Sequence, residues 1–144
     1  MIRDEHFRKL ENMYNRLPMS TDLKTILQIE KGSAEVRMPI KEKQKHAANA
    51  LHGMYYFKVL DDSTFFAANS LVEDVFVLTS QFNLHFLRPV VNGFIVAKGT
   101  VVHFGKTQII ADGSVFDDNG VLIARGTGTF LRSRINLNEK IGYQ

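Results

Sequence analysis

The 144-residue sequence contains no cysteine. This absence excludes disulfide bonds, a thiol nucleophile and any zinc site built on cysteine ligands. There is also no apolar run near the ~20 residues that a membrane-spanning helix requires. Because the N-terminal residues lack the apolar segment and small-residue cleavage site of a secretory signal, the sequence predicts a cytoplasmic protein.

An excess of one charge is missing as well. The net charge is only +3, and the lysines and arginines are scattered along the chain. The densest cluster, Lys41, Lys43 and Lys45, is interrupted by Glu42, and clusters of this kind are usually solvated loops. Without a basic stripe, small phosphorylated ligands are expected as partners and nucleic acid is not.

Several common catalytic motifs do not occur. The sequence has no G-x-S-x-G nucleophile elbow, no P-loop, no G-x-G-x-x-G that opens a helix and no H-E-x-x-H zinc helix. The five histidines show no ligand spacing. We therefore expect no metal site and no cofactor.

The most distinctive segment is His52–Leu71, which reads as one long helix. Apolar and small residues recur in it at spacings of three and four, the pattern of a helix packed along one side. Tyr55, Phe57 and Phe65 lie off that stripe, so a second side is also apolar. Midway along the helix are two adjacent acids, Asp61 and Asp62. Carboxylates in such a place are costly to bury unless they have partners or a chemical task.

The rest of the chain predicts an α+β domain spanning residues 1–144. Residues Asp4–Leu17 are typical of an amphipathic helix that ends at Pro18. The predicted strands are Leu23–Glu30, Ser33–Ile40, Val75–Leu87, Phe94–Phe104, Thr107–Phe116 and Val121–Leu131, followed by a polar tail over Ser133–Gln144. Short connections predict that the last four strands form an antiparallel meander. We expect a curved antiparallel sheet of about six strands around the central helix.

Two residues of this helix suggest chemistry. The free N–H groups at its start, around Gly53, could bind an oxyanion, although spacing alone favours His52-Gly53 as a simple helix entry. Asp61 is a candidate base or nucleophile, and Asp62 is its rival. Eight residues separate Gly53 from Asp61, which is about 12 Å along a helix. If both act on one carbonyl, they must come from two chains whose helices run antiparallel in a two-fold dimer.

The order and spacing of these motifs resemble those of the PaaI-type hotdog-fold acyl-CoA thioesterases. The resemblance covers roughly residues 33–133. The residues that carry it are His52-Gly53, the acid nine residues after His52, Arg88-Pro89, the Gly105-Lys106 turn and the segment DDNGVLIARGTGTFLRS. It implies a sheet wrapped around a long helix, thioester hydrolysis, active sites at a dimer interface, and a homodimer or a dimer of dimers. The substrate would be an acyl-CoA or an acyl carrier thioester.

The resemblance also implies roles for single residues. Gly53 would supply the oxyanion N–H, and His52 would help to shape or polarise the carbonyl site. Asp61 would act as nucleophile or as base on water, and Thr79 would position that water. Arg88, Gly105 and Lys106 fall where coenzyme A phosphates are often bound.

This sequence departs from the family pattern near the site. Met54 stands where many members have a second glycine, Phe65 where a serine or threonine is common, and His46 where an asparagine or glutamine often holds the carbonyl. Together with Asn49, these residues are expected to contact substrate. Crowding by Met54 and Phe65 leaves open a non-catalytic acyl-CoA binding protein.

Two further inferences concern the reaction and the acyl group. A hotdog dehydratase ranks lower, because its histidine motif is absent. Apolar side chains near the site, among them Tyr56, favour an aromatic or medium-chain acyl group.

Overall fold

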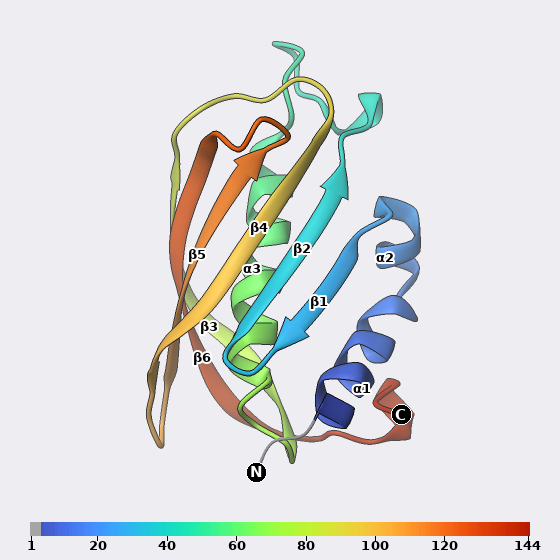
Figure 1. The fold of residues 1–144 in the computed structure, drawn as a ribbon, viewed down its shortest axis with the longest axis vertical. Helices are drawn as coiled ribbons and strands as arrows, with labels where there is room; N and C mark the ends of the chain where they lie inside the picture. Colours follow the sequence, from blue (N-terminus) through green and yellow to red (C-terminus); the bar gives the residue numbers. More distant parts are fainter. Residues whose placement is uncertain (1–3) are drawn as a thin grey trace.

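The computed structural model describes residues 4–144 and confirms the predicted architecture, a six-stranded antiparallel sheet that wraps around one long helix (Figure 1). The helices are α1 (Asp4–Asn15), α2 (Pro18–Leu23) and α3 (Gly53–Asn69), with 3-10 turns at Glu42–Gln44 and Glu139–Ile141. The strands are β1 (Ile26–Glu30), β2 (Ser33–Pro39), β3 (Val75–Phe86), β4 (Phe94–Phe104), β5 (Ile109–Asp117) and β6 (Leu122–Asn136). No helix among the described residues is long and apolar enough to cross a membrane.

Helix α3 lies directly against the inner face of the sheet. Its second half is almost completely buried, from Ser63 to Asn69. Gly99 of β4 allows this close approach, because a Cβ there would lie 2.4 Å from the carbonyl oxygen of Ser63. Near the start of α3, by contrast, Met54 is 58% exposed and Phe57 is 40% exposed. The helix is therefore covered by the sheet on one side and open on the other.

The order of the strands is β1-β2-β4-β5-β6-β3. Strands β4, β5 and β6 follow one another as predicted, but the prediction that β3 belongs to the same meander is wrong. Strand β3 pairs with β6, and β4 pairs with β2. The connection over residues 87–93 is long enough to carry the chain across the end of the sheet (Figure 1). As a result, β3 is an edge strand of twelve residues.

The two ends of the described chain differ from prediction. Residues from Pro18 onward form α2, so the strand predicted from Leu23 begins only at Ile26. The last strand continues to Asn136, and the tail then packs beside α1 (Figure 1). His6 of α1 links the tail to the end of α3. Its Nδ1 accepts from the Tyr143 hydroxyl at 2.8 Å, and its Nε2–H donates to the Asn69 carbonyl at 2.9 Å.

Candidate active site

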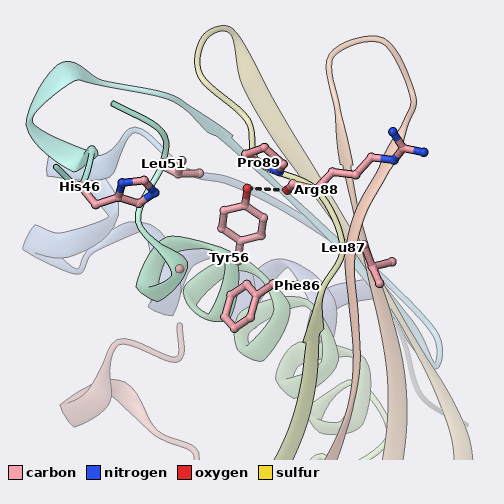
Figure 2. Close-up of a pocket in the computed structure, with 8 residues that line it drawn as sticks. His46, Leu51, Tyr56, Phe86, Leu87, Arg88 and Pro89 are labelled. Atoms are coloured by element: carbon pink, nitrogen blue, oxygen red, sulfur yellow. Dashed lines mark hydrogen bonds between the residues drawn. The ribbon is translucent and has the colours of Figure 1, made fainter. Parts of the chain in front are cut away.

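The start of α3 lies beside a pocket of about 370 Å³ (Figure 2). Its lining comes from the loop before α3, the first turn of α3 and the end of β3: His46, Leu51, Gly53, Tyr56, Phe86, Leu87, Arg88 and Pro89. The Tyr56 hydroxyl donates to the Arg88 carbonyl at 2.9 Å. This bond fixes the chain after β3 against the helix. In Figure 2 the guanidinium of Arg88 extends away from that bond.

Gly53 is the first residue of α3, and His52 is its N-cap. The His52 Nδ1 accepts from the Met54 N–H at 3.0 Å. The Gly53 N–H has no acceptor among the described residues, so it is a donor at the positive end of the helix dipole. A Cβ on residue 53 would lie 3.0 Å from the Phe86 ring, and glycine therefore suits the close packing here.

Asp61 lies midway along α3 and faces the edge strand. Its Oδ1 accepts from the Thr79 hydroxyl of β3 at 2.8 Å. Burial raises the pKa of the Asp61 carboxyl above its usual value, and the neighbouring charge of Asp62 adds to this rise. The Thr79 hydrogen bond and the charge of Lys58 act in the opposite direction but do not cancel it. A carboxylate with a raised pKa is a stronger base than an ordinary aspartate.

Asp62 faces the other way, toward α1. Its Oδ2 accepts from the Tyr14 hydroxyl at 2.7 Å and forms an ion pair with the Lys58 ammonium, also at 2.7 Å. Burial raises the pKa of Asp62, while Lys58 and Tyr14 oppose that rise. Burial and the proximity of Asp62 in turn raise the pKa of Tyr14. The two adjacent acids therefore do not share a proton across one hydrogen bond.

The remaining residues predicted near the start of α3 lie in different surroundings. His46 lines the pocket, with its ring centroid 6.5 Å from that of His52. Asn49 is an exposed loop residue with a φ of 65°. Phe65 is buried among the rings of Phe66, Phe76 and Phe130. The bulky side chain at position 65 is thus part of the core and does not fill the pocket at Gly53.

The Gly105-Lys106 turn joins β4 to β5 and is separate from that pocket. Arg132 of β6 donates through Nη1 to the carbonyls of Gly105 and Lys106, at 2.8 and 2.7 Å. Arg132 pairs with Val77, two residues before Thr79 on β3. Within one chain, the residues predicted to bind phosphate therefore form no single cluster: Arg88 follows one end of β3, and the turn lies nearer the other.

A second cavity, of about 310 Å³, lies one helical turn beyond Asp61. Its lining is almost entirely apolar and comes from α1, α3, β3, β6 and the C-terminal turn: Met13, Tyr14, Leu17, Phe65, Phe66, Phe76, Ile135 and Ile141. No pattern in the sequence predicted this cavity, because its wall joins segments from both ends of the chain. Among residues 4–144 no group of three His, Asp or Glu side chains could hold a metal ion.

Comparison with known proteins decides the family. The model of the thioesterase superfamily matches residues 48–124, more than half of the chain and the part that holds Gly53, Asp61 and Thr79. The chain belongs to the thioesterase superfamily. This membership, with relatives named as esterases and thioesterases, confirms the predicted class of enzyme, a thioester hydrolase.

Individual relatives agree with this membership. A Saccharolobus solfataricus protein, provisionally named an esterase, is 27% identical over 95% of this chain and 94% of its own length. A solved thioesterase family protein from Silicibacter pomeroyi is 27% identical, with a TM-score of 0.81 over 88% of this chain and 96% of that one. The Escherichia coli PaaI protein from the phenylacetic acid degradation operon is 21% identical, with a TM-score of 0.86 over 94% of this chain and 99% of that one. The last match shows the shared hotdog fold.

Proposed function

We propose that this thioesterase hydrolyses an acyl-CoA to a carboxylic acid and free coenzyme A, at sites shared by two copies of the chain. The observation that carries the proposal is the pair of Asp61 and Thr79. A half-buried carboxylate with a raised pKa and one hydroxyl partner, between α3 and the edge strand β3, is suited to accept a proton from water. The expected setting is the cytoplasm.

Two features of the fold support a two-chain site. Gly53 and Asp61 are eight residues apart on one helix, about 12 Å, which is too far for both to act on one carbonyl. In addition, β3 is a long edge strand with mostly exposed residues, and such edges pair readily with another strand. Antiparallel pairing of two β3 strands would place two α3 helices side by side in opposite directions. Gly53 of one chain would then face Asp61 of the other.

The proposed reaction follows from these two groups. The substrate carbonyl accepts a hydrogen bond from the Gly53 N–H, and Asp61 of the other chain removes a proton from water held by Thr79. The resulting hydroxide attacks the carbonyl carbon, and the negative charge that develops on the carbonyl oxygen is stabilised at the helix start. The C–S bond then breaks, and coenzyme A leaves as a thiolate that takes up a proton.

Asp61 could instead attack the carbonyl itself, forming an acyl anhydride that water then hydrolyses. Single turnover in ¹⁸O-labelled water separates the two routes. Water attacking the substrate places the label only in the released acid. A nucleophilic Asp61 retains ¹⁸O in its own carboxyl group when water attacks the anhydride at the aspartyl carbon.

The apolar cavity beyond Asp61 supports an apolar acyl group. Its size is at the lower end of the range for small-molecule pockets, which fits an aromatic or medium-chain acyl group. Its one polar group at the wall, the Tyr14 hydroxyl, already donates to Asp62. Because the other side chains of the lining are apolar, a hydroxylated acyl group would lose hydrogen bonds to water on entering the cavity and should be a poorer substrate.

Coenzyme A as the carrier rests on two observations. A Streptococcus mutans protein of the same fold, with a TM-score of 0.70 over 76% of this chain and 88% of that one, was solved bound to acetyl CoA. Arg88 and Lys106 are exposed cations close to the ends of β3, where they could bind phosphate.

The test is release of free thiol from acetyl-, hexanoyl-, decanoyl-, benzoyl- and phenylacetyl-CoA by the purified protein. We expect release, fastest with the aromatic or medium-chain esters. Saturable binding of these esters without release would support the alternative of a non-catalytic acyl-CoA binding protein. Release from acyl carrier protein thioesters alone would overturn coenzyme A as the carrier.

A further inference from the structure

Lys58 has two possible partners on its own helix. It lies three residues before Asp61 and four residues before Asp62, and both spacings bring side chains within reach on a helix. The structure shows only one of these pairs: the ammonium lies 2.7 Å from Asp62 Oδ2. The nearest hydrogen-bond partner of Asp61 is the Thr79 hydroxyl.

The surroundings of Asp62 explain this choice. Its side chain is 14% exposed and that of Lys58 is 19% exposed, so an unpaired carboxylate there would be costly. The Tyr14 hydroxyl approaches the same Oδ2 from α1, and the Lys58 ammonium also lies 5.2 Å from the centre of the Tyr14 ring. Helix α1 and Asp62 together hold the ammonium on the α1 side of α3.

We propose that Asp62 is a positioning residue, which keeps the Lys58 ammonium away from Asp61. The inference rests on the proposed function, in which Asp61 accepts a proton. An ammonium in direct contact would stabilise the charged carboxylate, occupy one of its oxygens and make it a weaker base. Asp62 prevents this contact because it holds the ammonium in an ion pair of its own.

Few charged or titratable groups lie near Asp61. The charges that act on Asp61 among the described residues are Asp62 and Lys58, both on α3. Strand β3 contributes the uncharged Thr79, and α1 contributes Tyr14, which contacts Asp62. The effect of Asp62 on Asp61 can therefore be tested with two substitutions.

The first variant is Asp62→Asn, which keeps the shape but releases the ammonium. We expect kcat to fall about tenfold and the acid limb of the pH profile of kcat to move to lower pH, because the loss of the Asp62 charge and the approach of the released ammonium both lower the pKa of Asp61. Adding Lys58→Met removes the released ammonium. The double variant should recover most of the lost kcat and return the acid limb toward its wild-type position.

A purely structural role for Asp62 predicts the opposite. The kcat of the double variant would then be no higher than that of Asp62→Asn, since the second substitution further disturbs the packing between α1 and α3. Tyr14→Phe is the matched control: it weakens the contact with α1 but leaves the ion pair, so its acid limb should not move to lower pH. A wild-type pH profile and kcat in Asp62→Asn, or a double variant as slow as the single one, would overturn the inference.

A second readout does not need turnover. Carboxyl ¹³C NMR should show Asp61 titrating at lower pH in Asp62→Asn than in the wild-type protein, and near the wild-type pH in the double variant. If the wild-type protein released no thiol from any ester, the proposed function would fail, and this titration would still decide the positioning role. An unchanged Asp61 titration in Asp62→Asn would contradict it.

Discussion

Asp61 and Asp62 are neighbours in the sequence but lie in two different regions of the molecule. Asp61 faces the edge strand β3, where it has one neutral hydrogen-bond partner, Thr79. Asp62 faces α1, where an ammonium and a phenolic hydroxyl bind the same carboxylate oxygen. The charge of Asp62 is neutralised locally, whereas that of Asp61 is not.

This difference separates a structural acid from a reactive one. The two donors of Asp62 stabilise its charged form and oppose the rise that burial causes in its pKa. A carboxylate that is partly buried with a single weak donor stays reactive at a cost to the fold. Helix geometry makes the separation possible, since consecutive side chains point about 100° apart around the axis. The variants below test this division of roles.

The largest expected effect is on turnover. Asp61→Asn should lower kcat about 1,000-fold, equivalent to about 4 kcal/mol of transition-state stabilisation, because the amide cannot accept the proton. Asp62→Asn should cost only about tenfold, since it acts through the basicity of Asp61. Thiol release measures both, with circular dichroism and size-exclusion chromatography as controls for folding and assembly. An Asp61→Asn protein with near wild-type kcat would remove Asp61 from the reaction.

The second-largest effect is on the free energy of unfolding. Here Asp62 should matter more than Asp61, the opposite of the ranking for turnover. Asp62→Ala should lower the free energy of unfolding by about 2–3 kcal/mol, because it leaves Lys58 without its partner and Tyr14 without its acceptor. Asp61→Ala should cost less than about 1 kcal/mol. Urea unfolding at one fixed protein concentration makes the comparison. Equal losses for the two alanines would mean that the residues do not differ as described.

A smaller effect is expected at Thr79. Thr79→Val removes the hydroxyl but keeps the branched shape, so kcat should fall about fivefold. The Thr79 hydrogen bond lowers the pKa of Asp61, and its loss should move the acid limb of kcat to higher pH. The pH profile of the variant measures this. An acid limb displaced to lower pH would contradict the assigned contact.

The smallest effect is a gain of stability in an inactive protein. Because the pKa of Asp61 is raised in the fold, the protonated form is favoured, and the wild-type protein loses stability as the pH rises from the ordinary aspartate range of about 4 through the folded pKa. An amide side chain at this position does not titrate and has no such loss. The Asp61→Asn variant should thus be more stable by about 0.5–1 kcal/mol at pH 7 and show no advantage below about pH 3. Unfolding curves at both pH values test the sign.

Much of the fold could be predicted from the sequence, where an element depends on residues close together in the chain. The periodicity of His52–Leu71 predicted α3, and the Asn119-Gly120 turn predicted the hairpin between β5 and β6. The position of β3 could not be predicted, because strand pairing depends on contacts distant in sequence. Residues 87–93 can serve a hairpin or a crossing equally well.

The candidate site shows the same limit. Asp61, Gly53 and Thr79 were found by spacing and family resemblance, and the structure places Asp61 and Thr79 in contact. The Lys58–Asp62 pair could have been read from its four-residue spacing. Tyr14 could not, because 48 residues separate it from Asp62, and only the packing of α1 brings them together.

The claim that two chains build each site can be tested by mixing two inactive variants. Gly53→Pro removes the N–H at the first helical position, where proline is tolerated and where His52 already has an extended conformation. Gly53→Ala is its control, since it crowds Phe86 but keeps the N–H. When Gly53→Pro and Asp61→Asn chains are unfolded and refolded together, half of the dimers are mixed. Each mixed dimer has one intact site, so about a quarter of the wild-type activity should return. If the mixture stayed as inactive as its two components, although mixed dimers had formed, Gly53 and Asp61 would not act together across two chains.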